Sequence, residues 1–119
     1  MISKKPKLRS VAVLGAGAWG ATLAWLLSTG GHPVSLWGRD RDKMLALSQS
    51  RRHEDPVPIE LCASVEITSE LDDAIDGADI VIIASPSQAL EQVTELLSRA
   101  LSRRSGKRFP ALVSAAKGI

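Results

Sequence analysis

A glycine-rich loop near the N-terminus constrains the fold of this chain more than any other feature. Residues 15–20 read GAGAWG; they follow a short apolar run, residues 11–14, and precede a largely apolar stretch, residues 18–28. The pattern G-x-G-x-x-G between a strand and a helix is typical of dinucleotide-binding domains. Gly15 would permit the tight turn, Gly17 the close approach of a pyrophosphate, and Gly20 close packing of the helix. A turn that merely requires small residues is the alternative, but it does not explain this position in the chain.

The rest of the chain alternates short apolar strands with helices. Strands are predicted at residues 34–37, 65–67, 80–84 and 111–114, and helices at residues 18–28, 41–51, 69–76 and 88–101. Residues 53–63 contain Pro56 and Pro58 and predict a surface loop. Such alternation implies right-handed crossovers and a parallel sheet with helices on both faces. We therefore predict an α/β fold: one domain over residues 1–119, with a Rossmann-type, doubly wound parallel sheet in three layers and about five strands.

Several local features follow from the same pattern. Ser69 is a plausible N-cap for the short helix that is predicted to end at Asp76. The side chains that we expect to face the core in the first two helices and the second strand are those of Met44, Leu45, Leu47, Trp25 and Trp37.

Composition excludes several classes of protein. The chain has 119 residues, 45% of them hydrophobic and 24% charged, as in soluble globular domains. Cys62 is the only cysteine, which excludes a disulfide within the chain and a cysteine cluster for zinc. No apolar stretch reaches the ~18 to 20 residues that span a membrane, and the basic N-terminus lacks the apolar segment of a secretory signal. We expect a cytoplasmic protein with no membrane span.

The net charge of +2 conceals an uneven distribution. Residues 1–52 carry 9 basic and 2 acidic side chains, residues 53–98 carry 11 acidic and no basic ones, and residues 99–119 carry 6 basic and no acidic ones. The basic segments could create a positive field for a phosphorylated ligand, or they could be solvated helix faces. Aromatic residues are 3% of the chain and offer no stacking platform, so no nucleic-acid partner is predicted.

The remaining polar residues predict no metal site. His32 and His53 have no neighbours in the sequence that suggest metal binding or nucleophilic chemistry, so we interpret both as structural or solvent-facing. The acidic residues of the third predicted helix and its exit are spread too widely to favour a metal over a solvated face; they are Asp72, Asp73, Asp76 and Asp79.

The end of the second predicted strand bears on the choice of dinucleotide. An acid that binds the adenine ribose normally follows this strand in NAD-binding proteins, whereas Gly38 occupies the position here. Arg39 follows, with a fork of donors suited to a 2′-phosphate. Asp40 either reaches a ribose hydroxyl or caps the next helix. We predict NADP as the favoured cofactor and NAD as a tolerated second.

Four sequence blocks indicate a family. GAGAWGATLA, SLWGRD, ADIVIIASPSQAL and VSAAKGI, in this order and spacing, resemble the N-terminal cofactor-binding domain of NAD(P)-dependent glycerol-3-phosphate dehydrogenase over nearly the whole chain. The aromatic residue before the third glycine, Pro-Ser-Gln after the fourth strand and Lys-Gly after the fifth are jointly specific. Enzymes of this family interconvert dihydroxyacetone phosphate and sn-glycerol 3-phosphate, and so supply the backbone of phospholipids.

The resemblance implies particular roles. Cofactor contacts are expected at Ala18, Trp19 and Arg39, and the turn Ser85-Pro86-Ser87 is expected beside the nicotinamide ribose. The Trp19 ring could instead be a core ring under the first helix. Lys117 matches a lysine that contacts both cofactor and glycerol phosphate; its ammonium group could meet a phosphate or a carbonyl oxygen that becomes negative during hydride transfer.

The chain also departs from the family. HEDPVPIELCAS stands where a Tyr-Leu-Pro-Gly-like turn is usual, so we place no site residues there. The helical second domain of the family, which supplies the acid–base lysine and most substrate and dimer contacts, is absent from residues 1–119. We therefore predict no catalytic residue in this chain, dinucleotide binding without turnover of a phosphorylated substrate, and a homodimer for the full-length enzyme.

The sequence is compatible with two other functions. The chain could be a non-catalytic dinucleotide-binding or sensor module. It could also be the cofactor domain of another two-domain dehydrogenase, of the ketopantoate reductase or 6-phosphogluconate dehydrogenase type.

Overall fold

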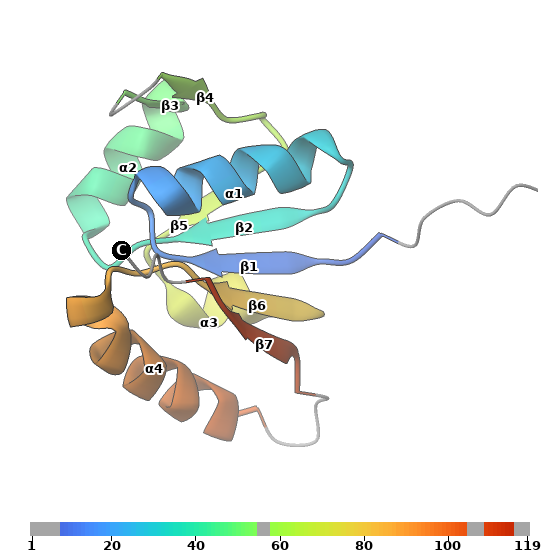
Figure 1. Ribbon diagram of the computed structural model, residues 1–119, viewed down its shortest axis with the longest axis vertical. Helices are drawn as coiled ribbons and strands as arrows, with labels where there is room; N and C mark the ends of the chain where they lie inside the picture. The colour runs from blue at the N-terminus through green and yellow to red at the C-terminus, as the bar shows by residue number, and fades with distance from the viewer. Residues whose placement is uncertain (1–7, 55–57, 105–108, 116–119) are drawn as a thin grey trace, which may run out of the picture.

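A parallel five-stranded sheet forms the centre of the molecule (Figure 1). The computed structural model describes residues 8–54, 58–104 and 109–115. The strand order is β5-β2-β1-β6-β7, and all paired strands of this sheet run parallel. The strands are β1 (Val11–Leu14), β2 (Val34–Trp37), β5 (Glu66–Thr68), β6 (Ile80–Ile83) and β7 (Ala111–Ser114). The predicted α/β class and the number of strands are confirmed.

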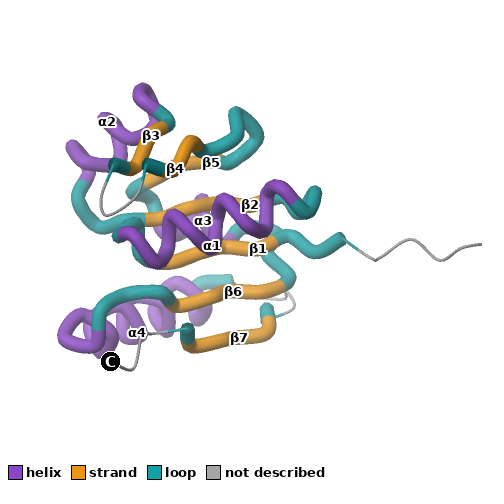
Figure 2. Tube along the Cα trace, turned by 45° about the horizontal axis from the view of Figure 1, so that its top comes forward, coloured by secondary structure: helices purple, strands orange, loops and turns teal. Residues whose placement is uncertain are grey.

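Two helices cover each face of the sheet (Figure 2). The helices are α1 (Ala18–Thr29), α2 (Arg41–Ser50), α3 (Leu71–Ile75) and α4 (Ser87–Ser102). From β1 the chain moves outward through α1 and α2 to β5, then returns through α3 to β6 and continues through α4 to β7. The two core clusters place α3 and α4 on the face opposite to α1 and α2, as right-handed crossovers would after such a reversal of direction.

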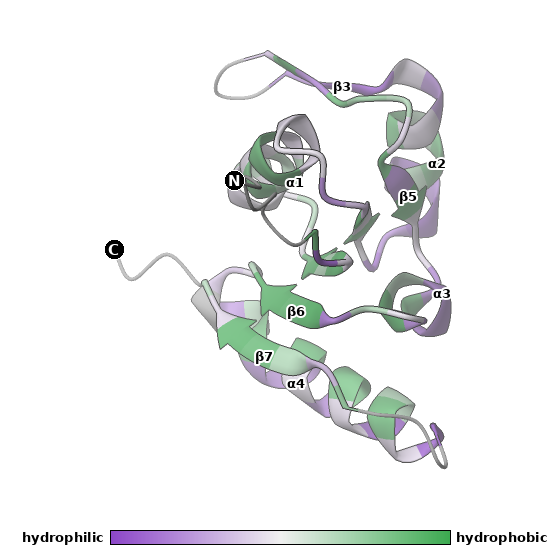
Figure 3. Cartoon of the chain, turned by 90° about the vertical axis from the view of Figure 1, so that its right-hand side faces the viewer, coloured by the Kyte–Doolittle hydropathy of each residue, from purple (hydrophilic) through white to green (hydrophobic). Residues whose placement is uncertain are grey.

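Side-chain alternation along β1 divides the core between the two faces. Val11 and Val13 belong to the cluster that contains α1 and α2 residues, whereas Ala12 and Leu14 belong to the cluster that contains α3 and α4 residues. All four are buried, as expected of a central strand covered by helices on both sides. β7, in contrast, is an edge strand whose four side chains are all exposed, although β6 and β7 are both hydrophobic (Figure 3).

A short hairpin replaces part of the predicted loop at residues 53–63. β3 (Arg52–His53) pairs antiparallel with β4 (Ile59–Glu60), and residues 55–57, with Pro56, lie outside the described part. Arg51 ends α2 in the left-handed conformation, and its amide and side chain donate to the carbonyls of Leu47 and Cys62. The loop prediction was wrong here because two-residue strands carry no detectable periodicity.

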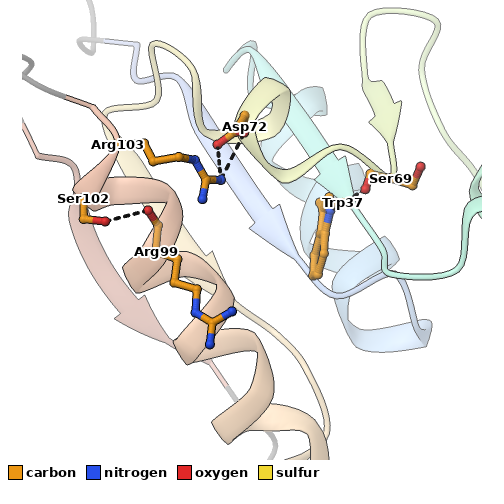
Figure 4. A network of polar contacts seen from close by, with 6 residues as sticks. All are labelled: Trp37, Ser69, Asp72, Arg99, Ser102 and Arg103. Atoms are coloured by element: carbon orange, nitrogen blue, oxygen red, sulfur yellow. Dashed lines mark hydrogen bonds and ion pairs between the residues drawn. The ribbon is translucent and has the colours of Figure 1, made fainter.

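The third helix also begins later than predicted. Its N-cap is Glu70 rather than Ser69, and the Thr68 hydroxyl accepts the Glu70 N–H at 2.9 Å. Ser69 instead offers its carbonyl to the indole N–H of Trp37 at 3.0 Å (Figure 4). This bond gives the buried indole of Trp37 its acceptor.

Three expected core side chains are buried and two are exposed. Met44, Leu47 and Trp37 are buried as predicted. Trp25 is 40% exposed and Leu45 is 58% exposed, so these two predictions were wrong. α1 is apolar on nearly every side, so its sequence does not indicate which face meets the sheet, and Leu45 points away because its neighbours Met44 and Leu47 pack inward. None of the helices described is long and apolar enough to cross a membrane.

Candidate functional site

The loops at the carboxyl ends of the strands meet where the direction of the chain reverses. β1 lies between β2, reached through α1, and β6, reached from the opposite direction. Ligands of doubly wound sheets bind at such a switch point. Residues 15–17, 38–40 and 84–86, which follow β1, β2 and β6, form the edge of the sheet at this point.

The three glycines of the loop differ in what surrounds them. Gly15 has a φ of +127°, and a Cβ there would lie 2.9 Å from the backbone carbonyl of Ala84. A Cβ on Gly20 would lie 1.7 Å from the Gly15 carbonyl oxygen, whereas a Cβ on Gly17 would meet no atom within 4 Å. Gly15 and Gly20 are therefore required by the fold, and Gly17 leaves open space next to the backbone.

The N-terminus of α1 faces this open space without a side-chain cap. Its N-cap residue is Gly17, and its first turn contains no acidic residue. The positive end of the helix dipole is thus available to an anion at the glycine loop.

A hollow of about 580 Å³ begins at the glycine loop and continues along α2. Its walls come from the glycine loop, the β2–α2 turn, α2 and β3, and its charged lining residues are Arg39, Asp40, Lys43, Arg52 and Glu54. Arg52 Nε donates to a Glu54 carboxylate oxygen at 2.8 Å, which raises the pKa of the Arg52 guanidinium. Gly38 also borders the hollow; a Cβ there would lie 2.5 Å from Met44 Sδ.

The two charged residues after β2 have different partners. Asp40 is the N-cap of α2 and accepts the Lys43 N–H at 3.1 Å, so the capping interpretation is confirmed. Arg39 extends across the sheet edge and donates a hydrogen bond from Nη1 to Gln92 Oε1 on α4.

Trp19 connects the glycine loop to the end of β7, the edge strand of the sheet. Its indole N–H donates to the carbonyl of Ala115, immediately after β7. The ring is 42% exposed and is not the core ring that we considered as an alternative.

The turn after β6 holds one buried hydroxyl. Ser85 is 4% exposed, and its Oγ donates to the Leu14 carbonyl at 3.3 Å, so this side chain connects β6 to β1. Pro86 is the N-cap residue of α4. The side chain of Ser87 and the whole of Lys117 lie outside the described atoms, so their expected contacts stay predictions.

Comparison with known proteins identifies the family of this chain. The family model described as "NAD-dependent glycerol-3-phosphate dehydrogenase N-terminus" matches residues 10–119. The chain belongs to this family. The glycerol-3-phosphate dehydrogenase [NAD(P)+] of Latilactobacillus sakei is 34% identical over 111 residues, which are 92% of this chain and 32% of the relative. The Corynebacterium glutamicum enzyme of the same name is 40% identical over 111 residues, with the same coverage.

Solved structures show the same fold. The glycerol-3-phosphate dehydrogenase of Coxiella burnetii matches with a TM-score of 0.80 and 23% identity, over 96% of this chain and 34% of that chain. An imine reductase from Pseudomonas sp. matches with a TM-score of 0.58 and 24% identity, over 95% and 34% of the two chains. The chain thus spans about a third of the length of the glycerol-3-phosphate dehydrogenases it matches.

Several other polar residues of this glycerol-3-phosphate dehydrogenase family member have structural contacts. His32 Nδ1 accepts the Arg9 N–H at 3.1 Å, as the structural interpretation expects. Asp72 pairs with Arg103 at 3.1 Å (Figure 4), and Asp79 accepts the Ser10 N–H. Among the residues that the structure describes, no group of histidine, cysteine and acidic side chains is placed to hold a metal.

Sequence reasoning missed part of the hollow. Lys43, Arg52 and His53 line it, and His53 Nδ1 is buried with no hydrogen-bond partner among the described atoms. The position of Lys43 could have been predicted from the sequence. It is three residues beyond the N-cap Asp40, in the first turn of α2, and therefore close to the end of β2. The positions of Arg52 and His53 could not, since the hairpin that turns them toward the hollow was not predicted.

Proposed function

We propose that this chain binds NADP(H), with NAD(H) as a tolerated second ligand, at the glycine loop and the adjoining hollow. The observation that carries the proposal is the open backbone at Gly17, which borders a hollow of about 580 Å³ that Arg39 also lines. A pyrophosphate at Gly17 would accept hydrogen bonds from the first turn of α1, and the adenosine half would extend toward Arg39. The contacts expected at Ala18, Trp19 and the 85–87 turn belong to this proposal.

The preference for NADP rests on the charges in the hollow. Two of its carboxylates are already engaged, since Asp40 caps α2 and Glu54 binds Arg52. Arg39 and Lys43 therefore offer positive charge to a 2′-phosphate, and no carboxylate at position 38 repels it.

We further propose that the whole protein reduces dihydroxyacetone phosphate to sn-glycerol 3-phosphate, or catalyses the reverse reaction, as a cytoplasmic homodimer. The nicotinamide would supply the hydride chemistry, while the residues of this chain bind and orient it. Lys117 is the residue that we expect to meet the phosphorylated substrate. Because hydride transfer requires cofactor and substrate to be positioned together, we expect the 119 residues alone to bind dinucleotide without turnover.

Calorimetric titration with NADPH and NADH tests the binding proposal. We expect tighter binding of NADPH, and a loss of about tenfold or more in NADPH affinity in Arg39→Ala, because a charge-assisted contact to phosphate is removed. NADH affinity should stay within about twofold. Arg99→Ala is the matched control, since Arg99 is an exposed arginine that pairs with Glu95 on α4. Equal or tighter binding of NADH by the unmodified chain would refute the preference for NADP.

Turnover tests the second part of the proposal. Dihydroxyacetone phosphate should be reduced with NADPH by a protein of the relatives' full length, and Lys117→Ala should lower its kcat/KM. Dinucleotide binding without any reduction by that full-length protein would support the non-catalytic module instead.

A further inference from the structure

One hydrogen bond joins two segments that are 53 residues apart in the sequence, and one of its partners, Arg39, also lines the hollow. Arg39, in the turn between β2 and α2, donates from Nη1 to the side-chain oxygen of Gln92, in the second turn of α4. Both side chains are exposed. The guanidinium has only donors, so the carbonyl end of the Gln92 amide must face it.

Both ends of this contact are attached to well-fixed backbone. The turn that carries Arg39 is held by the Gly38 N–H, which donates to the Thr68 carbonyl at 3.2 Å, and by the Asp40 cap. Gln92 precedes Val93, which is 1% exposed and anchors α4 in the core. The backbone is therefore fixed at both ends of the contact, and the two exposed side chains bridge the distance between them.

A neutral acceptor has a particular effect on an arginine. An arginine on the surface loses considerable rotamer entropy when it is fixed in one geometry. A hydrogen bond from an amide oxygen fixes the guanidinium but leaves its charge uncompensated and its other N–H donors available. A carboxylate at the same position would also fix it, but would neutralise the charge that attracts an anion.

We propose that Gln92 is a positioning residue for dinucleotide selectivity: it holds the Arg39 guanidinium at the hollow, still positively charged, for the 2′-phosphate of NADP(H). The inference rests on the proposed function, because it concerns the affinity of the same site. In this proposal the preference for NADP(H) over NAD(H) depends on α4 as well as on the residues after β2. α4 lies on the opposite face of the sheet from α2.

Four variants test the proposal by calorimetry with NADPH and NADH at one fixed ionic strength. Gln92→Ala should weaken NADPH binding about five- to tenfold, the effect of one lost hydrogen bond at an exposed position, and leave NADH binding within about twofold. Gln92→Glu should weaken NADPH binding by more than Gln92→Ala does. Gln92→Asn and Gln49→Ala are the comparison variants: the first keeps an amide and should recover part of the NADPH affinity, and the second removes an exposed glutamine from α2 and should change neither affinity.

A double-mutant cycle separates positioning from a structural role. If Gln92 acts through Arg39, Gln92→Ala should have no further effect on NADPH binding when Arg39 is already alanine. An equal loss for NADPH and NADH, an unchanged NADPH affinity in Gln92→Ala, or a loss that persists in the Arg39→Ala background would each overturn the proposal.

A thermal unfolding midpoint measured for every variant identifies a general loss of folding. If the unmodified chain binds neither dinucleotide, the proposed function itself fails; this result is distinct from normal NADPH binding that Gln92→Ala does not change.

Discussion

Gly17 and Gly20 lie three residues apart in one motif, yet the structure gives them different physical roles. A Cβ on Gly20 would overlap the Gly15 carbonyl oxygen, whereas a Cβ on Gly17 would enter open space. We expect Gly20→Ala to lower the free energy of unfolding by at least about 2 kcal/mol, because α1 must move away from the loop. Gly17→Ala should change it by less than about 1 kcal/mol, since the alanine fits the φ of −75° found there.

The same pair separates folding from binding. Gly17→Ala should reduce dinucleotide affinity by about tenfold or more, because its methyl group occupies the space that a pyrophosphate needs. Urea denaturation and calorimetry measure the two quantities. Similar losses of stability in the two variants would contradict the assignment.

Trp19 and Trp25 provide a second matched pair on α1. They are 42% and 40% exposed, but only Trp19 belongs to the glycine loop and contacts Ala115. We expect NADP+ to change the tryptophan emission of the chain through Trp19, because the ligand alters the polarity around that ring. The change should disappear in Trp19→Phe and persist in Trp25→Phe. A response that is lost in Trp25→Phe would show that the ligand affects another part of α1.

Among the elements, the central and edge strands of the sheet offer a direct comparison of burial. Val13 of β1 is 0% exposed and Val113 of β7 is 46% exposed. Val13→Thr should cost about 1–3 kcal/mol, because it buries a hydroxyl group among apolar side chains. Val113→Thr should cost less than about 0.5 kcal/mol, as expected of an exposed position. Chemical denaturation compares the two, and equal costs would mean that Val113 is buried in solution.

Most helices and strands of this chain could be predicted from its sequence, but some of their boundaries and buried faces could not. The five main strands and the helices were predictable because short apolar runs and helical spacings of three and four mark buried positions locally. The β3–β4 hairpin and the α3 N-cap were not, because a two-residue strand has no period and a helix start can shift by one residue without any change in the apolar pattern. Trp25 was misjudged because an almost uniformly apolar helix does not identify its buried face.

Part of the candidate site could likewise be predicted from the sequence, and part of it could not. The glycine loop, Arg39 and the Asp40 cap were predictable from local patterns and turn chemistry. The bonds from Arg39 to Gln92 and from Trp19 to Ala115 were not, because they depend on how the crossovers bring distant segments to one edge of the sheet. The hollow wall formed by β3 was missed for the same reason.

For the whole molecule, the uneven charge distribution predicts how salt affects binding. Basic side chains predominate in residues 1–52 and 99–119, and Arg39 and Lys43 line an open hollow. Because salt screens exposed charges, raising the ionic strength should weaken NADPH binding more than NADH binding. Calorimetry over a series of sodium chloride concentrations gives the two slopes. Parallel slopes would indicate that the 2′-phosphate does not meet these cations.

The close packing of Gly38 against Met44 restricts how the cofactor preference could evolve. A carboxylate directly after β2 is the simplest route to NAD specificity. A Cβ at that position would lie 2.5 Å from the sulfur of Met44, which is 4% exposed, so the Met44 side chain would have to move within the core. A lineage acquiring an acid at position 38 would therefore have to repack or replace Met44 as well, or would pass through a less stable intermediate. The order of substitutions, and not only their identity, would decide whether such a switch is accessible.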